Sequence, residues 1–205
     1  MAEDDKKIDI KAFNRWSLEG IKVDDHGLQR YITLQPRIVP KTGARYAGNR
    51  FYKSRIFIVE RLINKLMVPG HKGKKHYKTS YSITGKAQTA YDIVEEAFSH
   101  IEKTTKENPI KVFVKALENA AQREEIITIE YGGARYPKAV ECSPQRRVDL
   151  ALRYMAQGAY HKTFNTKKSI VSSLAEEIIS AYRVSNTSHA ISKKLEIERQ
   201  SDSSR

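Results

Sequence analysis

A pair of adjacent glycines, Gly132-Gly133, constrains the fold of this chain more than any other feature. The pair lies inside a strand-like stretch over residues 126–142, and two successive glycines allow the positive φ angles of a type I′ turn between antiparallel strands. The register that follows from this turn pairs Tyr131 with Ala134, Glu130 with Arg135, and Ile129 with Tyr136. Because a two-stranded hairpin alone is only marginally stable in water, we expect either a projecting arm that leans on a partner or a hairpin that packs on its own helices.

Helical patterns surround this hairpin. Asn108-Pro109 and Ser143-Pro144 each place an N-cap residue before a proline at the first helical position, and Ser54 and Ser188 are candidate caps of the first and last helices. Apolar residues then recur at helical spacing, as they do in four other stretches, which predicts helices over residues 54–68, 86–104, 109–120, 143–159, 167–183 and 190–199. The residues expected in the core are Val59, Leu62, Ile63, Leu66, Val94, Ala97, Phe98, Ile101, Val112, Phe113, Ala116, Leu117, Ala120, Val148, Leu152, Met155, Ala159, Val171, Leu174, Ile178 and Tyr182. We therefore predict a mainly α fold: a single bundle of about six helices with a protruding two-stranded β-hairpin arm and a basic N-terminal extension.

The positive charge is concentrated in one segment. The chain has a net charge of +13, and residues 37–78 carry 12 Lys or Arg residues against a single Glu, a local net charge of +11. An ordinary soluble surface intersperses the two signs, whereas a concentrated positive field suits a polyanion, with nucleic acid as the first candidate. An anionic membrane surface fits less well, because no basic segment has an amphipathic face rich in Trp, Phe and Leu.

The sequence also indicates the compartment. No apolar run reaches the ~20 residues that span a bilayer, and the acidic N-terminus lacks the hydrophobic segment of a signal peptide. The single cysteine, Cys142, excludes an internal disulfide framework. These features predict a cytoplasmic protein without a membrane partner.

Three regions are expected along the chain. Residues 1–53 form the N-terminal extension, which is partly extended and contacts RNA in its later half, and Trp16 is a candidate anchor to the body or to a partner. Residues 54–200 form a helical RNA-binding domain that carries the arm at 126–142, and residues 201–205 should fray.

The later half of the extension combines basic and aromatic residues. Residues 21–40 contain turn signals and two prolines, which predict an extended tail. Over residues 39–55, cations alternate with Tyr46, Phe51 and Tyr52, a composition that suits phosphate pairing and stacking on unpaired bases. The alternative is a solvated loop whose aromatic rings cover the edge of the core.

A second basic segment, residues 70–86, separates the first two expected helices. It is too polar for the core, and neither of its Gly-Lys pairs has the spacing of a phosphate-cradling loop. His71 and His76 lie five residues apart without cysteine partners, so solvated or phosphate-facing histidines are a better interpretation than a metal site. Apart from Lys86 at its end, the lysines of this segment are Lys72, Lys74, Lys75 and Lys78.

Two arginines lie where a helix disfavours them. Arg146 and Arg147 occupy the first turn of the helix that begins at Ser143, where a cation opposes the macrodipole by roughly 0.3–1 kcal/mol. They therefore either meet an anionic partner or pair within the protein with Glu141 or Asp149.

The sequence has no pattern of an enzyme active site. The G-x-S-x-G, H-E-x-x-H, CxxC and Rossmann glycine patterns are absent. Cys142 lies beside Glu141, which disfavours a thiolate, and Glu124-Glu125 follows a helix end as a solvated corner would. We predict no catalytic residues, no metal, no cofactor and no small-molecule substrate.

Five motifs follow one another along the chain: INKLMVPG, TGKAQTAYDIVEEAF, NPIKVFVKALENAAQREE, IEYGGARYPKAVE and SPQRRVDLALRYMAQGA. In this order they resemble the small-subunit ribosomal protein seven family, of the archaeal type, over about residues 59–183. The resemblance implies a helical protein that binds the 3′ major domain of small-subunit rRNA, nucleates assembly of the head, and has a β-arm near the exit-site (E-site) tRNA and the mRNA. It also implies ribosomal protein eleven as a neighbour. The stretch HKGKKHYKTSYSI has no counterpart in the bacterial members.

By motif position, the arm role falls on Tyr131, Gly132, Gly133, Ala134 and Arg135. Together with the charge map, the expected rRNA-binding residues are Arg37, Lys41, Arg45, Arg50, Lys53, Arg55, Arg61, Lys65, Lys72, Lys74, Lys75, Lys78, Lys86, Arg146 and Arg147. Two alternatives remain: a DNA-binding helical regulator, which needs a recognition helix and usually a symmetric dimer surface, and an RNA-modifying enzyme, which needs a cofactor pocket or activated residues.

Overall fold

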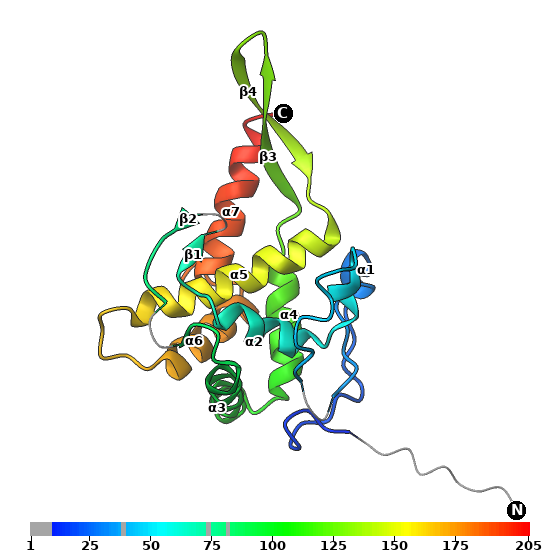
Figure 1. Cartoon of the computed structure of the whole chain (residues 1–205), viewed down its shortest axis with the longest axis vertical. Helices are drawn as coiled ribbons and strands as arrows, with labels where there is room; N and C mark the ends of the chain where they lie inside the picture. Colours follow the sequence, from blue (N-terminus) through cyan, green and yellow to red (C-terminus); the bar gives the residue numbers. More distant parts are fainter. Residues whose placement is uncertain (1–9, 38–39, 73–74, 81–82) are drawn as a thin grey trace, which may run out of the picture.

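The computed structural model of the chain describes residues 10–37, 40–72, 75–80 and 83–205. In chain order its helices are α1 (His26–Gln29), α2 (Ile58–Leu66), α3 (Ala87–Thr105), α4 (Pro109–Ala120), α5 (Pro144–Thr163), α6 (Ile170–Tyr182) and α7 (His189–Asp202), with a 3-10 helix at Tyr52–Arg55. The strands are β1 (His71–Lys72), β2 (Lys75–His76), β3 (Glu124–Tyr131) and β4 (Ala134–Glu141). The predicted mainly α fold with one protruding hairpin is confirmed (Figure 1).

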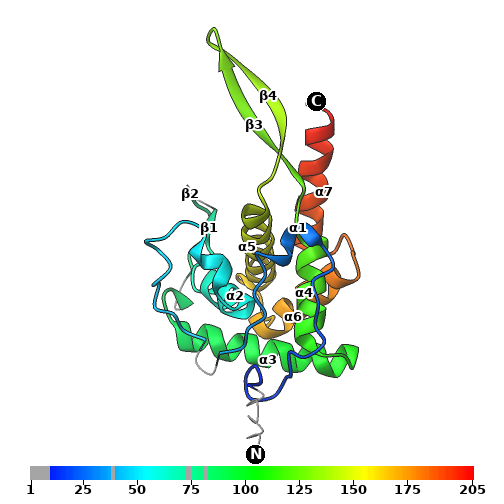
Figure 2. The ribbon, with the colours of Figure 1, turned by 90° about the vertical axis from the view of Figure 1, so that its right-hand side faces the viewer.

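The arm is the antiparallel hairpin of β3 and β4, which projects from the helical body (Figures 1 and 2). Its two turn glycines have φ angles of +56° and +82°, and the three predicted cross-strand pairs are present. At the base, the Ala139 N–H donates to the Ser204 carbonyl at 3.4 Å and Arg205 pairs with Glu124 at 2.5 Å. The base of the hairpin therefore packs on α7, while its tip projects as an arm.

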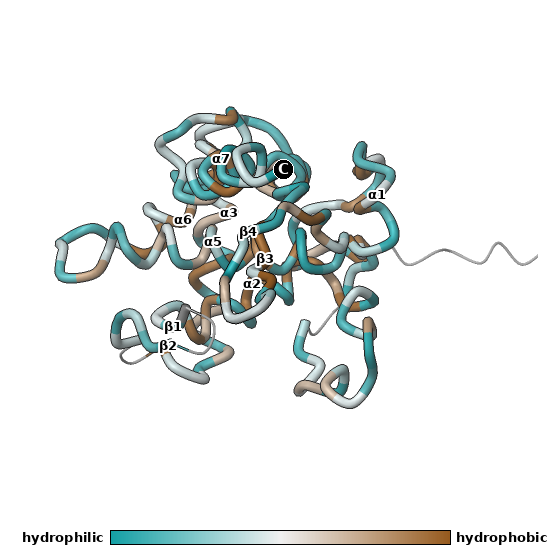
Figure 3. The backbone as a smooth tube through the Cα atoms, turned by 90° about the horizontal axis from the view of Figure 1, so that it is seen from above, coloured by the Kyte–Doolittle hydropathy of each residue, from teal (hydrophilic) through white to brown (hydrophobic). Residues whose placement is uncertain are grey.

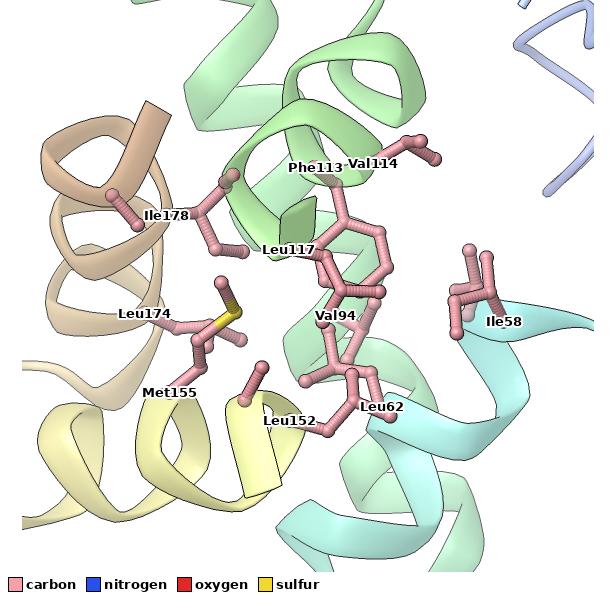
Figure 4. Close-up of a cluster of buried hydrophobic side chains, with 14 of the residues drawn as sticks. Ile58, Leu62, Val94, Phe113, Val114, Leu117, Leu152, Met155, Leu174 and Ile178 are labelled. Carbon is pink, nitrogen blue, oxygen red and sulfur yellow. The ribbon is translucent and has the colours of Figure 1, made fainter. Parts of the chain in front are cut away.

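The core lies where α2 to α6 meet. Figure 4 shows side chains from all five helices converging, with Ile58 and Leu62 from α2, Phe113 from α4, Met155 from α5 and Leu174 from α6. These side chains are fully buried. The core therefore fixes the position of α5 relative to α2. Segments that contact both helices are thereby held at a fixed distance from one another.

Hydropathy follows this arrangement. In Figure 3 the rim of the body is mostly hydrophilic and the hydrophobic stretches lie mostly toward its middle. The residues expected in the core are buried, except Val171 and Tyr182, which pack against it half-buried. Helical periodicity therefore located the helical part of the core, but it did not predict Leu28 and Ile32 from the N-terminal segment.

The helix α2 begins later than predicted. Ser54, the expected cap, donates its hydroxyl to the Phe51 carbonyl at 2.6 Å and belongs to the 3-10 helix. The Ile58 N–H donates to the Thr33 carbonyl at 3.0 Å, and Thr33 forms a parallel bridge with Phe57. The start of α2 is thus set by a pairing of Phe57 with the N-terminal segment, which periodicity does not reveal.

The prediction of an extended tail over residues 21–40 is wrong where α1 interrupts it. Asp25 caps α1 by accepting a backbone hydrogen bond at 2.8 Å, and Leu28 is fully buried in the core cluster. Trp16 anchors the segment that precedes α1, as expected, and its ring centroid lies 6.0 Å from that of Phe98.

Two of the predicted helix caps are confirmed. The side chain of Asn108 accepts from the Ile110 N–H at 3.0 Å, and that of Ser188 accepts from the Ile191 N–H at 3.3 Å. Ser143 precedes α5, but its side chain accepts no such hydrogen bond, so the prediction of a side-chain cap there is wrong.

Candidate nucleic-acid interface

The basic residues before α2 lie in a segment, residues 40–55, that we call the strap. Its beginning is fixed to α2 by Glu60, whose Oε1 accepts from the Thr42 N–H at 2.9 Å and from the Thr42 hydroxyl at 2.6 Å. Glu60 is 1% exposed and lies in the first turn of α2, where the helix dipole favours a negative charge. The single carboxylate of residues 37–78 is therefore an internal anchor and faces no external partner.

The end of the strap is fixed to α5 by Asp149. Lys53 pairs with one oxygen of this carboxylate, and Arg61 pairs with the other at 3.1 Å. Arg61 also donates to the Tyr31 carbonyl at 2.8 Å. Burial opposes ionisation of Asp149, but the hydrogen bond from Lys53 and the charge of Arg61 outweigh burial and lower its pKa. Asp149 is thus a charged anchor between the strap, α2 and α5.

Two grooves follow α5. One, of about 580 Å³, lies between the strap and the first half of α5, and the other, of about 250 Å³, lies between α5 and the end of α2. Arg153 lines both grooves, and we call the two grooves together the track. Cationic side chains along this track are Arg50, Lys53, Lys65, Arg146 and Arg153.

The charged groups around Lys65 show that this track is positively charged. Burial lowers the pKa of Lys65, Asp149 partly offsets that effect, and the neighbouring charges of Arg153, Lys53 and Arg61 lower it further. Lys65 and three further cations therefore lie around a single carboxylate here. Such a concentration of positive charge attracts a polyanion.

Most of the predicted rRNA-binding residues share one side of the body. Figure 2 shows the strap and the β1–β2 hairpin on the side of α2. Of the predicted set, eight are exposed: Arg37, Lys41, Arg45, Arg50, Arg55, Lys75, Lys86 and Arg146. Four are half-buried: Lys53, Lys65, Lys78 and Arg147. Lys74 and the side chain of Lys72 lie outside the described part of the chain.

Arg61 differs from the rest of the predicted set. It is only 5% exposed, and burial lowers its pKa while the charge of Asp149 raises it. Both terminal nitrogens of Arg61 are hydrogen-bonded inside the protein. Arg61 therefore stabilises the elements beneath the candidate interface and is not positioned to contact RNA.

The two arginines at the start of α5 pair within the protein. Arg146 Nε lies 2.7 and 2.8 Å from the two carboxylate oxygens of Glu125, and Arg147 pairs with Asp25 at 2.9 Å. The two carboxylates that the sequence suggested as their partners take no part: Glu141 and Asp149. Arg146 remains 53% exposed, so its pairing leaves it accessible from the groove.

Sequence reasoning missed the residues that organise this interface. Arg153 follows Arg146 by seven residues and Asp149 by four, so helical spacing on α5 could have placed all three on one face. Glu60 had a clearer signal, because an isolated acid in a strongly basic segment is a candidate internal anchor.

The arm carries apolar side chains on one face of its projecting part. Alternation along β3 and the register with β4 place four exposed side chains on that face: Tyr131 at 81%, Tyr136 at 59%, Ile127 at 42% and Ile129 at 39%. The other face carries the ion pair of Glu130 with Arg135 at 3.7 Å. The predicted arm residues 131–135 thus form an exposed tip.

The remaining chemistry is structural. Burial, followed by the charge of Glu125, raises the pKa of the Cys142 thiol to about 11, which suppresses the thiolate needed of a nucleophile. Within residues 10–37, 40–72, 75–80 and 83–205, no three His, Cys, Asp or Glu side chains gather as a metal site. No helix in the described part of the chain is long and apolar enough to cross a bilayer.

Comparison with known proteins identifies the family. The family described as "Ribosomal protein S7p/S5e" matches residues 28–205. The chain is 56% identical to the small ribosomal subunit protein uS7 of Nanoarchaeum equitans, over 96% of this chain and 99% of that protein. It is 45% identical to the uS7 protein of Archaeoglobus fulgidus, over 97% of each chain, and 46% identical to that of Methanothrix thermoacetophila, over 93% of this chain and 97% of that one. The chain therefore belongs to the ribosomal protein S7p/S5e family, whose members are structural proteins of the small ribosomal subunit and not enzymes.

Proposed function

We propose that this protein is a primary rRNA-binding protein that contacts the 3′ major domain of small-subunit rRNA and nucleates assembly of the head. The observation that carries this proposal is the strap, which exposes Lys41, Arg45 and Arg55 while its neighbouring acids, Glu60 and Asp149, are held inside. A surface built in this way presents cations in fixed positions, so less conformational entropy is lost when phosphates bind.

The geometry favours RNA over a DNA duplex. Reading the major groove needs a helix with one exposed face free of neighbours. The most cationic helix, α5, packs on α6 and α7 and is flanked by the strap, so it has no such face. The grooves instead suit the irregular shape and unpaired nucleotides of folded RNA.

The salt dependence of binding tests the proposal. In filter binding of the protein to a transcript of an archaeal 3′ major domain, log affinity should fall linearly with log salt concentration. Each neutralised phosphate contributes about 0.7–0.9 to the slope. A flat line would refute binding through phosphates.

Two charge-matched triple variants locate the surface. The strap variant replaces three exposed cations, Lys41→Gln, Arg45→Gln and Arg55→Gln, and should reduce the slope by about 2–3. The control removes the same charge from the corner of α3 and α4, with Lys103→Gln, Lys106→Gln and Lys111→Gln. Equal losses of affinity in both variants would mean that only net charge matters and that the strap is not the binding surface.

The lysines of the β1–β2 segment provide a further test. Replacing Lys72, Lys74 and Lys75 by alanine should weaken rRNA binding while the melting temperature stays within a few degrees of wild type, because the sequence gives these lysines no apolar or core role. A collapse of the melting temperature would instead make this segment a structural element.

We further propose that the arm lies near the E-site tRNA and the mRNA, with ribosomal protein eleven as a neighbour. An exposed apolar face on a two-stranded hairpin supports this, since such a face is stabilised by a partner. Subunits reconstituted with a protein whose residues 129–136 are replaced by a short glycine linker should lose E-site tRNA occupancy or reading-frame control. Wild-type values of both would leave the arm as a packing element.

A further inference from the structure

The groove between the strap and α5 has an aromatic wall that the fold does not require. Phe51 is 54% exposed and has a φ of +62°, a conformation that a bulky side chain rarely adopts. The Arg50 guanidinium lies 5.4 Å from the centroid of its ring, and Tyr46 lines the same wall. An exposed ring beside a guanidinium forms a surface on which a base stacks.

The floor of the groove has a polar group without a partner. Gln145 is 6% exposed, and its side-chain oxygen accepts no hydrogen bond from any residue that the structure describes. Beside it Leu150, at 4% exposure, supplies an apolar surface. Because a buried acceptor without a donor is unfavourable, a ligand that brings a hydroxyl or amino donor is favoured here.

The rim of the groove is cationic and prearranged. Arg50 and Arg153 form no ion pair with any residue that the structure describes, and Arg146 is half exposed beside them. The one acid at the groove, Asp149, is neutralised by Lys53 and Arg61 and therefore does not repel an anion. The rim thus suits a phosphate.

We propose that this groove binds one unpaired nucleotide of RNA, with its base against Phe51, a donor group directed at Gln145, and its phosphate on Arg50 and Arg153. The volume of about 580 Å³ lies within the roughly 300–1,000 Å³ of ligand sites. A base stacked inside a duplex reaches neither the ring nor the amide, so the site selects an extruded or single-stranded nucleotide. The inference rests on the proposed function, because it takes RNA as the ligand.

The variant Phe51→Gly removes the ring while keeping the backbone, since glycine adopts a positive φ without strain. The control is Val184→Gly, because Val184 is another exposed apolar residue at a positive φ, 59% exposed with a φ of +54°, and does not line the groove. With the archaeal 3′ major domain transcript and full-length protein, Phe51→Gly should weaken binding about 5- to 100-fold without changing the salt slope. Val184→Gly should stay within about twofold of wild type.

A second pair of readouts completes the test. Arg153→Gln should weaken binding and also reduce the salt slope by about 1, because it removes a phosphate contact. In dimethyl sulfate and hydroxyl-acylation probing, wild type should protect an unpaired nucleotide that Phe51→Gly leaves reactive. If wild type binds the transcript and Phe51→Gly binds equally well with the same protections, the nucleotide site is refuted. If wild type itself does not bind the transcript, it is the proposed rRNA-binding function that fails.

Discussion

Replacing Asp149 by asparagine should destabilise the protein by about 3–5 kcal/mol, because it leaves Arg61 buried without a counter-charge. Arg61 is 5% exposed and keeps only its hydrogen bond to the Tyr31 carbonyl at 2.8 Å. Lys53, the other partner of Asp149, has a side chain that is 38% exposed, so solvent screens its charge and its share of the loss is small. In a protein of this size 1 kcal/mol corresponds to about 2–4 °C, so the melting temperature should fall by about 6–20 °C.

Urea unfolding followed by circular dichroism at pH 7 measures this loss. The control is Glu176→Gln, which removes an exposed ion pair with Lys168 and should lose no more than about 1 kcal/mol. A double variant, Asp149→Leu with Arg61→Met, should recover much of the stability, because it removes the buried charge together with its partner. If Asp149→Asn loses no more than the control, the buried-charge argument is refuted.

The pH dependence provides an independent check on Asp149. Its pKa in the folded protein lies below the ordinary value of 3.8, despite burial, because of Lys53 and Arg61. The stabilisation from its charge is therefore fully present above that value and is lost as the pH falls through the lower folded pKa. The difference in stability between wild type and Asp149→Asn should be constant from pH 7 to pH 5 and should shrink only in stronger acid.

Three further outcomes follow from the packing. Gly158→Ala should lose about 1–3 kcal/mol in urea unfolding, because the added Cβ would lie 2.7 Å from His189 Cβ, where α5 meets α7. Iodoacetamide should modify Cys142 slowly in the native protein at pH 7.4 and rapidly in urea. Since the folded state raises the pKa of this thiol from 9.0 to about 11, its contribution to stability should be lost as the pH rises through that interval. Replacement of residues 129–136 by a glycine linker should leave the helical circular dichroism intact, and a loss of helix signal would show that the arm is needed for folding.

What the sequence predicted well was local. The hairpin register depends on two neighbouring glycines, and the start of α4 depends on an asparagine two residues from the N–H it caps. What it missed depends on contacts between distant parts of the chain. The start of α2 is set by Thr33, and the partner of Arg147 is Asp25, 122 residues away. Spacing within a helix contains no information on such distant pairs. The partners suggested for Arg146 and Arg147 from neighbouring positions were therefore wrong.

The strap shows why a segment with five cations and no acid does not behave as a free tail. Left alone, like charges repel and favour disorder. Here Glu60 holds one end and Asp149 the other, and each of these acids is shielded from the exposed surface by the groups it binds. These contacts therefore offset the repulsion among the strap cations in the free protein. The exposed cations then already lie near the positions in which phosphates would contact them. If the strap binds RNA as proposed, losing either anchor should weaken that binding, and the loss should appear in affinity more than in the salt slope, since the number of exposed cations is unchanged.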